Sequence, residues 1–298
     1  MAESIACINM KGGVGKTTVT VNLAISLIKK GKNVLVVDTD PQFNCSQSLI
    51  KKYTGNLDAY FARGEHTIVS ILKKWDRKLI QKDVHDIESP IMNLYHGVTG
   101  QTGILDLIPG SLEVITETNN TSETNLLSYF RKNEERFNQN YDFIIFDCAP
   151  TWGILTTAIF KIAANVIIPT TLDEFSTIGI RLLIEQLSTL VDAGDSINGL
   201  GVVYMMLSGT TRSEGISRKQ EPLKRSLETF LEEEASLQIE TELNPFDTWF
   251  YANKTVASTG AIYEDLNVSK NSTVKDEFIS KSDALAQEVI ERIENRNG

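Results

Sequence analysis

The sequence is poor in cysteine and has no long apolar run. Its 298 residues include three cysteines, at positions 7, 45 and 148, without the close spacing of a metal site. We therefore expect them to serve as small apolar filler or as reduced surface thiols, which suit a reducing compartment. No stretch approaches the roughly 18 consecutive apolar residues of a membrane-spanning helix, and the first residues lack the basic and apolar regions of a signal peptide. These absences predict a cytoplasmic protein without stable membrane insertion.

An excess of basic residues is also missing. The formal net charge is −10 at pH 7, which argues against a uniformly basic nucleic-acid binder. A local basic patch remains compatible with this balance, because screening limits the reach of a charge to about 8 Å at physiological salt. The sequence has no internal repeat and no low-complexity tract. We expect a single domain over residues 1–298, in which residues 51–104 are either a partner-facing insertion or ordinary scaffold.

A glycine-rich loop near the start is the most informative feature that is present. Residues 11–18 follow the apolar run 5–8 and precede the helical pattern 19–28, which is the strand, loop and helix order of a phosphate-binding loop. Glycines let backbone N–H groups turn toward phosphate oxygens, and the helix start adds the positive end of its dipole. The residues expected to bind phosphate are Lys11, Gly12, Gly13, Val14, Gly15, Lys16, Thr17 and Thr18. Lys16 would supply a point charge, and Thr17 a hydroxyl for Mg²⁺.

The first glycine of the standard phosphate-binding loop is missing. The usual pattern is G-x-x-x-x-G-K-[ST], and here Met10 occupies the position of its first glycine, followed by Lys11. This variant resembles the deviant Walker A motif of the ParA/MinD/iron-protein ATPases. The resemblance implies ATP as the ligand, and it implies that Lys11 reaches across a dimer interface to the partner's nucleotide.

Acidic residues follow two further apolar runs. Asp38 and Asp40 come after residues 32–37, and Asp147 comes after residues 143–146. Ligands of α/β folds bind at the carboxyl ends of the strands, where carboxylates can hold Mg²⁺ and its water shell. We therefore predict a metal shell of Thr17, Asp40 and Asp147. The alternative for Asp147 is a cap on the next helix.

Residues 38–42 match the D-x-D-P-Q motif of switch I in the ParA-like family. The resemblance implies that Asp40 positions the attacking water, so the expected catalytic residues are Lys11, Lys16 and Asp40. Asp38 matches the first aspartate, which would lie near the phosphate loop and the metal waters. An equally weighted alternative makes Asp38 a structural partner of loop amides.

Apolar runs alternate with helical patterns along the rest of the chain. Further strands are expected within 105–110, where the strand runs into a loop, at 166–169 and at 200–206, and helices at 179–190, 215–235 and 276–296. This alternation predicts an α/β fold of the P-loop NTPase type, with a mostly parallel, doubly wound sheet and helices on both faces. The resemblance covers nearly the whole chain. The loop near residue 11 implies a short, Soj-like or plasmid-partition type without an N-terminal helix-turn-helix domain.

The sequence can be compared with three branches of this family, which differ in function. An iron–sulfur reductase needs cysteines from two subunits around one cluster, and Cys148 has no second cysteine at a matching place. A MinD-like membrane-surface ATPase needs a basic amphipathic C-terminal helix, whereas the last helix has a mixed, acidic face that favours packing on the sheet. DNA partition is favoured by a basic cluster: Arg212, Arg218, Lys219, Lys224 and Arg225. The alternative for the cluster is a solvated helix face.

Residues 244–251 depart from the Soj-like pattern. Soj-like members carry an arginine-rich stretch here, but this segment is aromatic and acidic. Part of the usual DNA surface is therefore missing or moved, with Lys270, Lys275 and Lys281 as candidates. The same stretch approaches the adenine in relatives, so we expect Pro245 and Phe246 to pack on the base, with core or interface packing as the alternative.

These features predict an ATP-driven dimerisation switch for plasmid or chromosome partition. The homodimer would hold two Mg²⁺-ATP and bind non-specific double-stranded DNA of the nucleoid, mostly through phosphate contacts. A centromere-binding, ParB-like partner would stimulate slow hydrolysis and release the dimer. The alternative is an ATPase that positions a protein cargo, or a MinD-like ATPase at the membrane surface.

Overall fold

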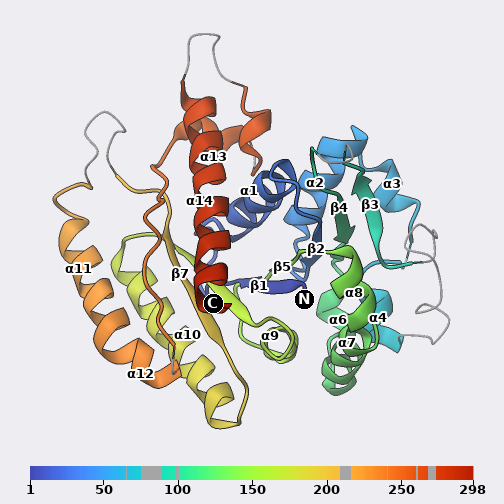
Figure 1. Ribbon diagram of the computed structural model, residues 1–298, viewed down its shortest axis with the longest axis horizontal. Coiled ribbons are helices and arrows are strands. Elements are labelled where there is room, and N and C mark those ends of the chain that lie inside the picture. Colours follow the sequence, from blue (N-terminus) through green and yellow to red (C-terminus); the bar gives the residue numbers. More distant parts are fainter. Residues whose placement is uncertain are drawn as a thin grey trace. The chain divides into compact units, whose positions relative to one another are not determined.

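The computed structural model describes residues 1–64, 66–74, 89–97, 101–208, 216–239, 241–259, 261–267 and 273–297. Its strands are β1 (Glu3–Cys7), β2 (Val34–Asp38), β3 (Met92–Tyr95), β4 (Leu105–Ile108), β5 (Phe143–Asp147), β6 (Asn165–Thr170) and β7 (Asn198–Tyr204). They form a seven-stranded sheet in the order β3-β4-β2-β5-β1-β6-β7 (Figure 1). The mostly parallel sheet confirms the predicted α/β fold.

The chain divides into two compact units. Unit 1 consists of Met1–Ala6 and Ala24–Ala164, and unit 2 consists of Cys7–Leu23 and Asn165–Gly298. The helix α1 (Lys16–Lys29) begins in unit 2 and ends in unit 1. The further helices of unit 1 are α2 (Asn44–Thr54), α3 (Asp58–Phe61), α4 (Ile68–Lys74), α6 (Val114–Glu117), α7 (Asn120–Lys132), α8 (Glu134–Asn140) and α9 (Ile154–Phe160). Those of unit 2 are α10 (Glu174–Asp192), α11 (Glu221–Phe230), a π-helical turn (Leu231–Ala235), α12 (Ser236–Ile239), α13 (Lys254–Thr259), a 3-10 turn (Tyr263–Asp265) and α14 (Val274–Asn297).

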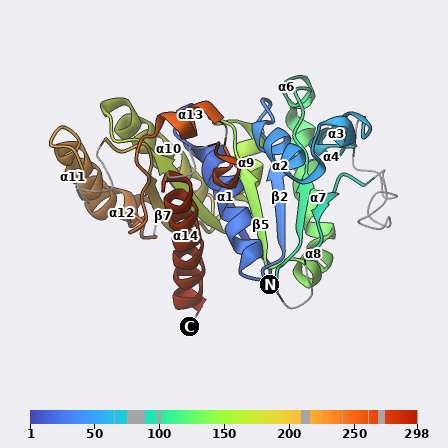
Figure 2. The ribbon, with the colours of Figure 1, turned by 90° about the horizontal axis from the view of Figure 1, so that it is seen from above.

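The strand β2 organises unit 1. All five of its residues are buried, as expected for a strand of a parallel sheet that is covered on both faces. It pairs in parallel with β4 and with β5, and Figure 2 shows β5 beside β2. The register of the pairing with β5 places Asp38 directly opposite Asp147. The edge strand β3 pairs antiparallel with β4. The register of β2 and β5 therefore brings two acidic side chains together at their carboxyl ends.

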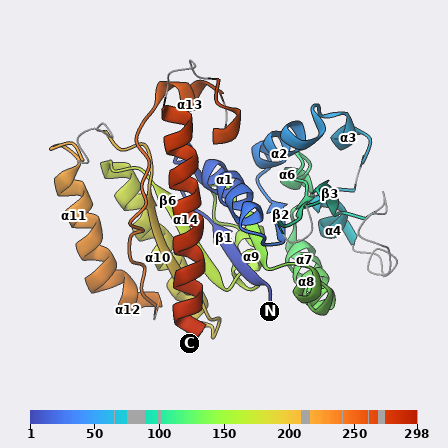
Figure 3. The ribbon, with the colours of Figure 1, turned by 45° about the horizontal axis from the view of Figure 1, so that its top comes forward.

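In unit 2 the strands β6 and β7 pair in parallel, and α14 contacts β7 (Figure 3). The apolar side chains of α14 are at most 5% exposed at Phe278, Leu285, Val289 and Ile293. This burial agrees with the expectation that the last helix packs on the protein. None of the helices in the described ranges is long and apolar enough to cross a membrane.

The three cysteine side chains are all buried within their units and form no disulfide. Cys7 and Cys148 are 1% exposed, and Cys45 is fully buried. The burial confirms the first expectation, small apolar filler, and contradicts the alternative of surface thiols.

The side chain of Asn22 links the first half of α1 to the segment before α14. Its Nδ2 donates to the carbonyl of Ala261 over 2.6 Å, and its Oδ1 accepts from the backbone N–H of Tyr263 over 2.9 Å. We expect Asn22→Ala to reduce the free energy of unfolding by about 2–3 kcal/mol, because the two backbone partners of this buried side chain lose their hydrogen bonds. Urea unfolding measures this loss.

The exposed helical change Thr189→Ala serves as the control for this variant and should stay within about 0.5 kcal/mol of the wild type. A loss in Asn22→Ala no larger than that of the control would show that the two backbone groups do not depend on this side chain.

Candidate functional site

The glycine-rich loop lies in unit 2 between β1 and α1. Gly13 and Gly15 have φ angles of 75° and 98°, in the left-handed region that favours glycine. A Cβ atom at Gly15 would lie 2.9 Å from Cε of Met205, so the loop also packs against the residue that follows β7. The structure therefore has the strand, loop and helix order that the sequence predicted.

The side chain of Lys16 folds back over this loop. It is only 6% exposed, and its Nζ donates to the carbonyl oxygen of Lys11 over 3.1 Å. A buried ammonium with a loop carbonyl as acceptor can exchange that weak acceptor for a charged phosphate oxygen. Thr17 and Thr18 follow in the first turn of α1, where the positive end of the helix dipole favours an anion.

Lys11 is fixed at the start of the loop by both its backbone and its side chain. The backbone N–H of Lys11 donates to Oδ1 of the buried Asn9 over 2.9 Å. Its amine forms an ion pair with Asp173, at 2.7 and 2.8 Å from the two carboxylate oxygens. Burial raises the pKa of Asp173, but the hydrogen bonds from Lys11, Thr171 and Ser176 outweigh it and lower the pKa far below its usual value.

The carboxylates at the strand ends lie in unit 1. Asp38 and Asp147 are 0% and 1% exposed and occupy opposite positions in the register of β2 and β5. Burial and then the charge of Asp147 raise the pKa of Asp38 to about 8. A divalent cation beside such a pair would offset the repulsion. The donor chemistry of the pair fits Mg²⁺, which prefers carboxylate oxygens.

Asp38 also anchors the loop that carries Asp40. Its Oδ2 accepts from the backbone N–H and the hydroxyl of Ser46 over 2.8 and 2.7 Å, and its Oδ1 accepts from the backbone N–H of Asp40 over 3.2 Å. The Ser46 hydroxyl in turn accepts from the N–H of Gly110 over 2.8 Å. These contacts are the ones expected from the alternative interpretation of Asp38, in which it is a structural partner of loop amides.

Asp40 itself is partly exposed, and its Oδ1 accepts from the backbone N–H of Gln42 over 2.9 Å. Its second carboxylate oxygen makes it a candidate to orient a water molecule. The structural alternative for Asp147 is wrong, because α9 begins at Ile154 and its cap is Gly153 without a side-chain hydrogen bond.

The comparisons with known proteins agree with this geometry. The sequence profile of a family described as an AAA domain matches residues 2–198. The chromosome-partitioning ATPase Soj of Treponema pallidum is 28% identical over 211 residues, which cover 70% of this chain and 73% of the relative. The sporulation initiation inhibitor protein Soj of Bacillus subtilis is 30% identical over 188 residues, covering 62% and 64%. The chain belongs to this family and is a ParA/Soj-like ATPase.

Solved structures share the fold of this ParA/Soj-like ATPase. The structure of pNOB8 ParA has a TM-score of 0.71 at 21% identity, covering 99% of this chain and 100% of that chain. The same protein bound to nonspecific DNA has a TM-score of 0.67 at 20% identity, covering 99% of both chains. Cobyrinic acid a,c-diamide synthase from Mycobacterium smegmatis, with bound ATP analogue and magnesium, has a TM-score of 0.55 at 21% identity, covering 76% and 82%.

One member of the basic cluster of the ParA/Soj-like ATPase, Arg212, is not among the residues that the structure describes. The predicted helix over 215–235 is corrected at its start, because α11 begins at Glu221 with proline in its first turn. Arg218 and Lys219 are exposed and precede the helix. They therefore lie outside the helix in which the sequence analysis placed them.

Two members of the cluster form ion pairs along α11. Nζ of Lys224 lies 3.4 Å from Glu228, and Nε of Arg225 lies 3.5 Å from Glu221. Pairs at this spacing on an exposed helix contribute only about 0.3–0.5 kcal/mol. A phosphate can therefore displace them, and the role of the cluster in DNA binding stays a prediction.

The aromatic segment after Asn244 packs within unit 2. Phe246 is 2% exposed, and the guanidinium carbon of Arg292 lies 4.0 Å from its ring centroid. Arg292 also donates to the carbonyl oxygen of Pro245 over 2.6 Å. These are the contacts of core packing, the stated alternative to adenine binding by Pro245 and Phe246.

The further basic candidates near the end of the chain differ in their surroundings. Lys281 lies 5.8 and 5.5 Å from the ring centroids of Trp249 and Tyr251, and burial lowers its pKa. Lys275 lies in the first turn of α14, and Lys270 is outside the described residues. The Lys281 side chain therefore packs near two aromatic rings, in addition to being a basic candidate for the DNA surface.

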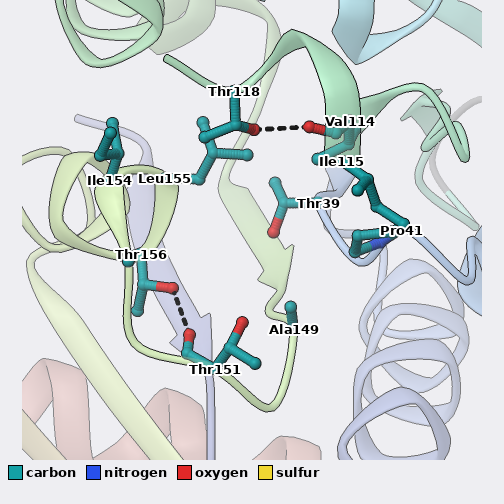
Figure 4. Close-up of a pocket in the computed structure, with 11 residues that line it drawn as sticks. Thr39, Pro41, Val114, Ile115, Thr118, Ala149, Thr151, Ile154, Leu155 and Thr156 are labelled. Carbon is teal, nitrogen blue, oxygen red and sulfur yellow. Dashed lines mark hydrogen bonds between the residues drawn. The ribbon is translucent and has the colours of Figure 1, made fainter. Parts of the chain in front are cut away.

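A pocket of about 310 Å³ in unit 1 was not expected from the sequence (Figure 4). Residues that line it come from the loops after Asp38 and Asp147 and from α6 and α9: Thr39, Pro41, Ile115, Thr151, Leu155 and Thr156. The Thr156 hydroxyl donates to the carbonyl of Thr151 over 2.8 Å. The pocket is mostly apolar, and no motif in the sequence indicates it.

Proposed function

We propose that this ParA/Soj-like ATPase is an ATP-driven dimerisation switch in DNA partition. The observation that carries the proposal is the deviant phosphate loop, with Lys16 folded over it and Lys11 at its start. The names of the Soj relatives, a chromosome-partitioning ATPase among them, support the process. The two states of the switch would be the ATP-bound dimer and the subunits released after hydrolysis.

The nucleotide would be Mg²⁺-ATP, held by residues 11–18. Thr17, Asp40 and Asp147 would hold the metal and its waters, and Asp40 would orient the attacking water. When bound, Mg²⁺ would supply positive charge that offsets the negative charge of the phosphates. The neighbour with bound ATP analogue and magnesium supports this cofactor pair for the fold. Intrinsic hydrolysis is expected to be slow, since a switch needs a long-lived ATP state.

The ATP dimer would bind non-specific double-stranded DNA through the basic cluster near α11. The neighbour pNOB8 ParA bound to nonspecific DNA supports this kind of ligand. A ParB-like protein at the centromere site would stimulate hydrolysis and release the dimer. Hydrolysis, DNA release and dimer dissociation would then follow one another in each cycle at the nucleoid.

The test is DNA binding across a salt series with ATP, with ADP and without nucleotide. We expect binding only with ATP, with an affinity that falls steeply as salt rises, because phosphate contacts release counterions. The double variant Arg218→Ala, Lys219→Ala should weaken binding and reduce the salt slope by about 2, since each lost phosphate contact removes about 0.9.

The control is the double variant Lys29→Ala, Lys30→Ala, at the end of α1, which should keep the wild-type slope. An absence of DNA binding in every nucleotide state, alongside intact ATP-dependent dimerisation, would contradict DNA partition and direct the search to a protein cargo.

A further inference from the structure

The amine of Lys11 is occupied within its own subunit. It donates to both carboxylate oxygens of Asp173 and to the hydroxyl of Ser176, which lies 3.1 Å away. All three residues belong to unit 2, although Lys11 and Asp173 are 162 positions apart in the sequence. A side chain with three donor N–H groups is thus largely satisfied in this structure without a second subunit.

The carboxylate of Asp173 is itself held in place by other groups. Asp173 caps α10 and accepts from the backbone N–H of Ser176 over 3.0 Å. It also accepts from the hydroxyls of Thr171 and Ser176, over 2.6 and 3.0 Å. These bonds do not involve Lys11, so the acceptor stays preorganised if the lysine leaves.

The amine can leave without a rearrangement of the loop. The backbone of Lys11 is fixed by Asn9, whose Nδ2 donates to the carbonyl of Pro169 on β6 over 2.9 Å. The side chains of Lys11 and Asp173 remain 32% and 39% exposed. The ion pair therefore opens toward solvent through rotation of one flexible side chain.

We infer that Asp173 is a positioning residue that holds Lys11 within its own subunit until the nucleotide of a second subunit competes for the amine. The inference rests on the proposed function, in which Lys11 contacts the partner's phosphates. One amine cannot bind the Asp173 carboxylate and remote phosphates at the same time. Asp173 thereby sets the protein concentration at which the ATP-bound dimer forms.

The test compares ATP-dependent dimerisation of the wild type and of Asp173→Asn by analytical ultracentrifugation. Asparagine is as good a helix cap as aspartate, so the variant removes the charge and keeps the cap. We expect its ATP dimer to form at a protein concentration about three- to fivefold lower, which is the scale of a partly exposed ion pair. Basal ATP hydrolysis at low protein concentration should rise in parallel.

The matched control is Glu174→Gln, which removes the same charge at the neighbouring exposed position and should leave dimerisation unchanged. Asp173→Asn should also have no effect in a Lys11→Ala background, since the shift acts through the lysine. A shift that persists without Lys11 would indicate a structural role and overturn the inference, as would unchanged or weakened dimerisation of Asp173→Asn. A wild type that stays monomeric with ATP would instead refute the proposed function.

Discussion

Replacement of Lys16 by alanine is expected to abolish ATP binding, with a rise in the dissociation constant of at least about a hundredfold. The side chain is 6% exposed and lies over a loop in which a Cβ atom at Gly12 or Gly13 would have no heavy atom within 4 Å. A hydrogen bond to a charged group contributes about 1.5–3 kcal/mol, and each 1.4 kcal/mol is about tenfold in affinity. The alanine variant loses both the point charge and its donors.

Titration calorimetry with ATP and Mg²⁺ measures this loss. Lys11→Ala is the informative companion, because that variant should keep ATP affinity within a few fold and lose stimulated turnover. Thermal unfolding of both variants excludes a general loss of structure. If Lys16→Ala bound ATP about as tightly as the wild type, the loop would not be the phosphate site. If Lys11→Ala kept full stimulated turnover, the proposal that Lys11 contacts the nucleotide of a second subunit would be wrong.

The second large effect is expected for Asp40→Ala. A residue that positions the attacking water contributes typically about 10²–10⁴-fold to the rate, so hydrolysis should fall by that factor. ATP binding should persist, because Asp38 is unchanged in the variant. It still accepts from the backbone N–H at position 40 and so keeps the loop in place. The ATP-bound dimer should therefore live longer than that of the wild type.

Single-turnover hydrolysis and dimer lifetime are the two measurements. The control is Asp58→Ala, an exposed aspartate at the start of α3 in the same unit, which should hydrolyse ATP at the wild-type rate. A variant at Asp40 with a normal single-turnover rate would remove this residue from the catalytic set. A simultaneous loss of ATP binding would point to a structural role of Asp40 in the loop.

The phosphate loop and the strand-end carboxylates could be predicted because their signals are local. The glycines, the lysines and the flanking apolar runs all fall within residues 5–28. Asp38 and Asp147 could be placed at strand ends because four or more apolar residues precede each of them. Parallel pairing then makes these ends neighbours, which the register of β2 and β5 confirms.

Contacts between distant segments could not be predicted. The ion pair of Lys11 and Asp173 depends on where α10 begins relative to β6, and the sequence analysis assigned no role to Asp173. The bond from Ser46 to Asp38 depends on the return of α2 toward the end of β2. At α11 a local signal existed, since Pro222 favours the first turn of a helix, but the sequence analysis began the helix earlier.

The burial of all three cysteines makes the native protein suitable for site-specific labelling. Maleimide dyes react with accessible thiolates, and Cys7, Cys45 and Cys148 are each at most 1% exposed. One cysteine introduced at an exposed position such as Thr189 would then carry nearly all of the dye. Dimer formation and DNA release could be followed by fluorescence in real time, with every native thiol left in place.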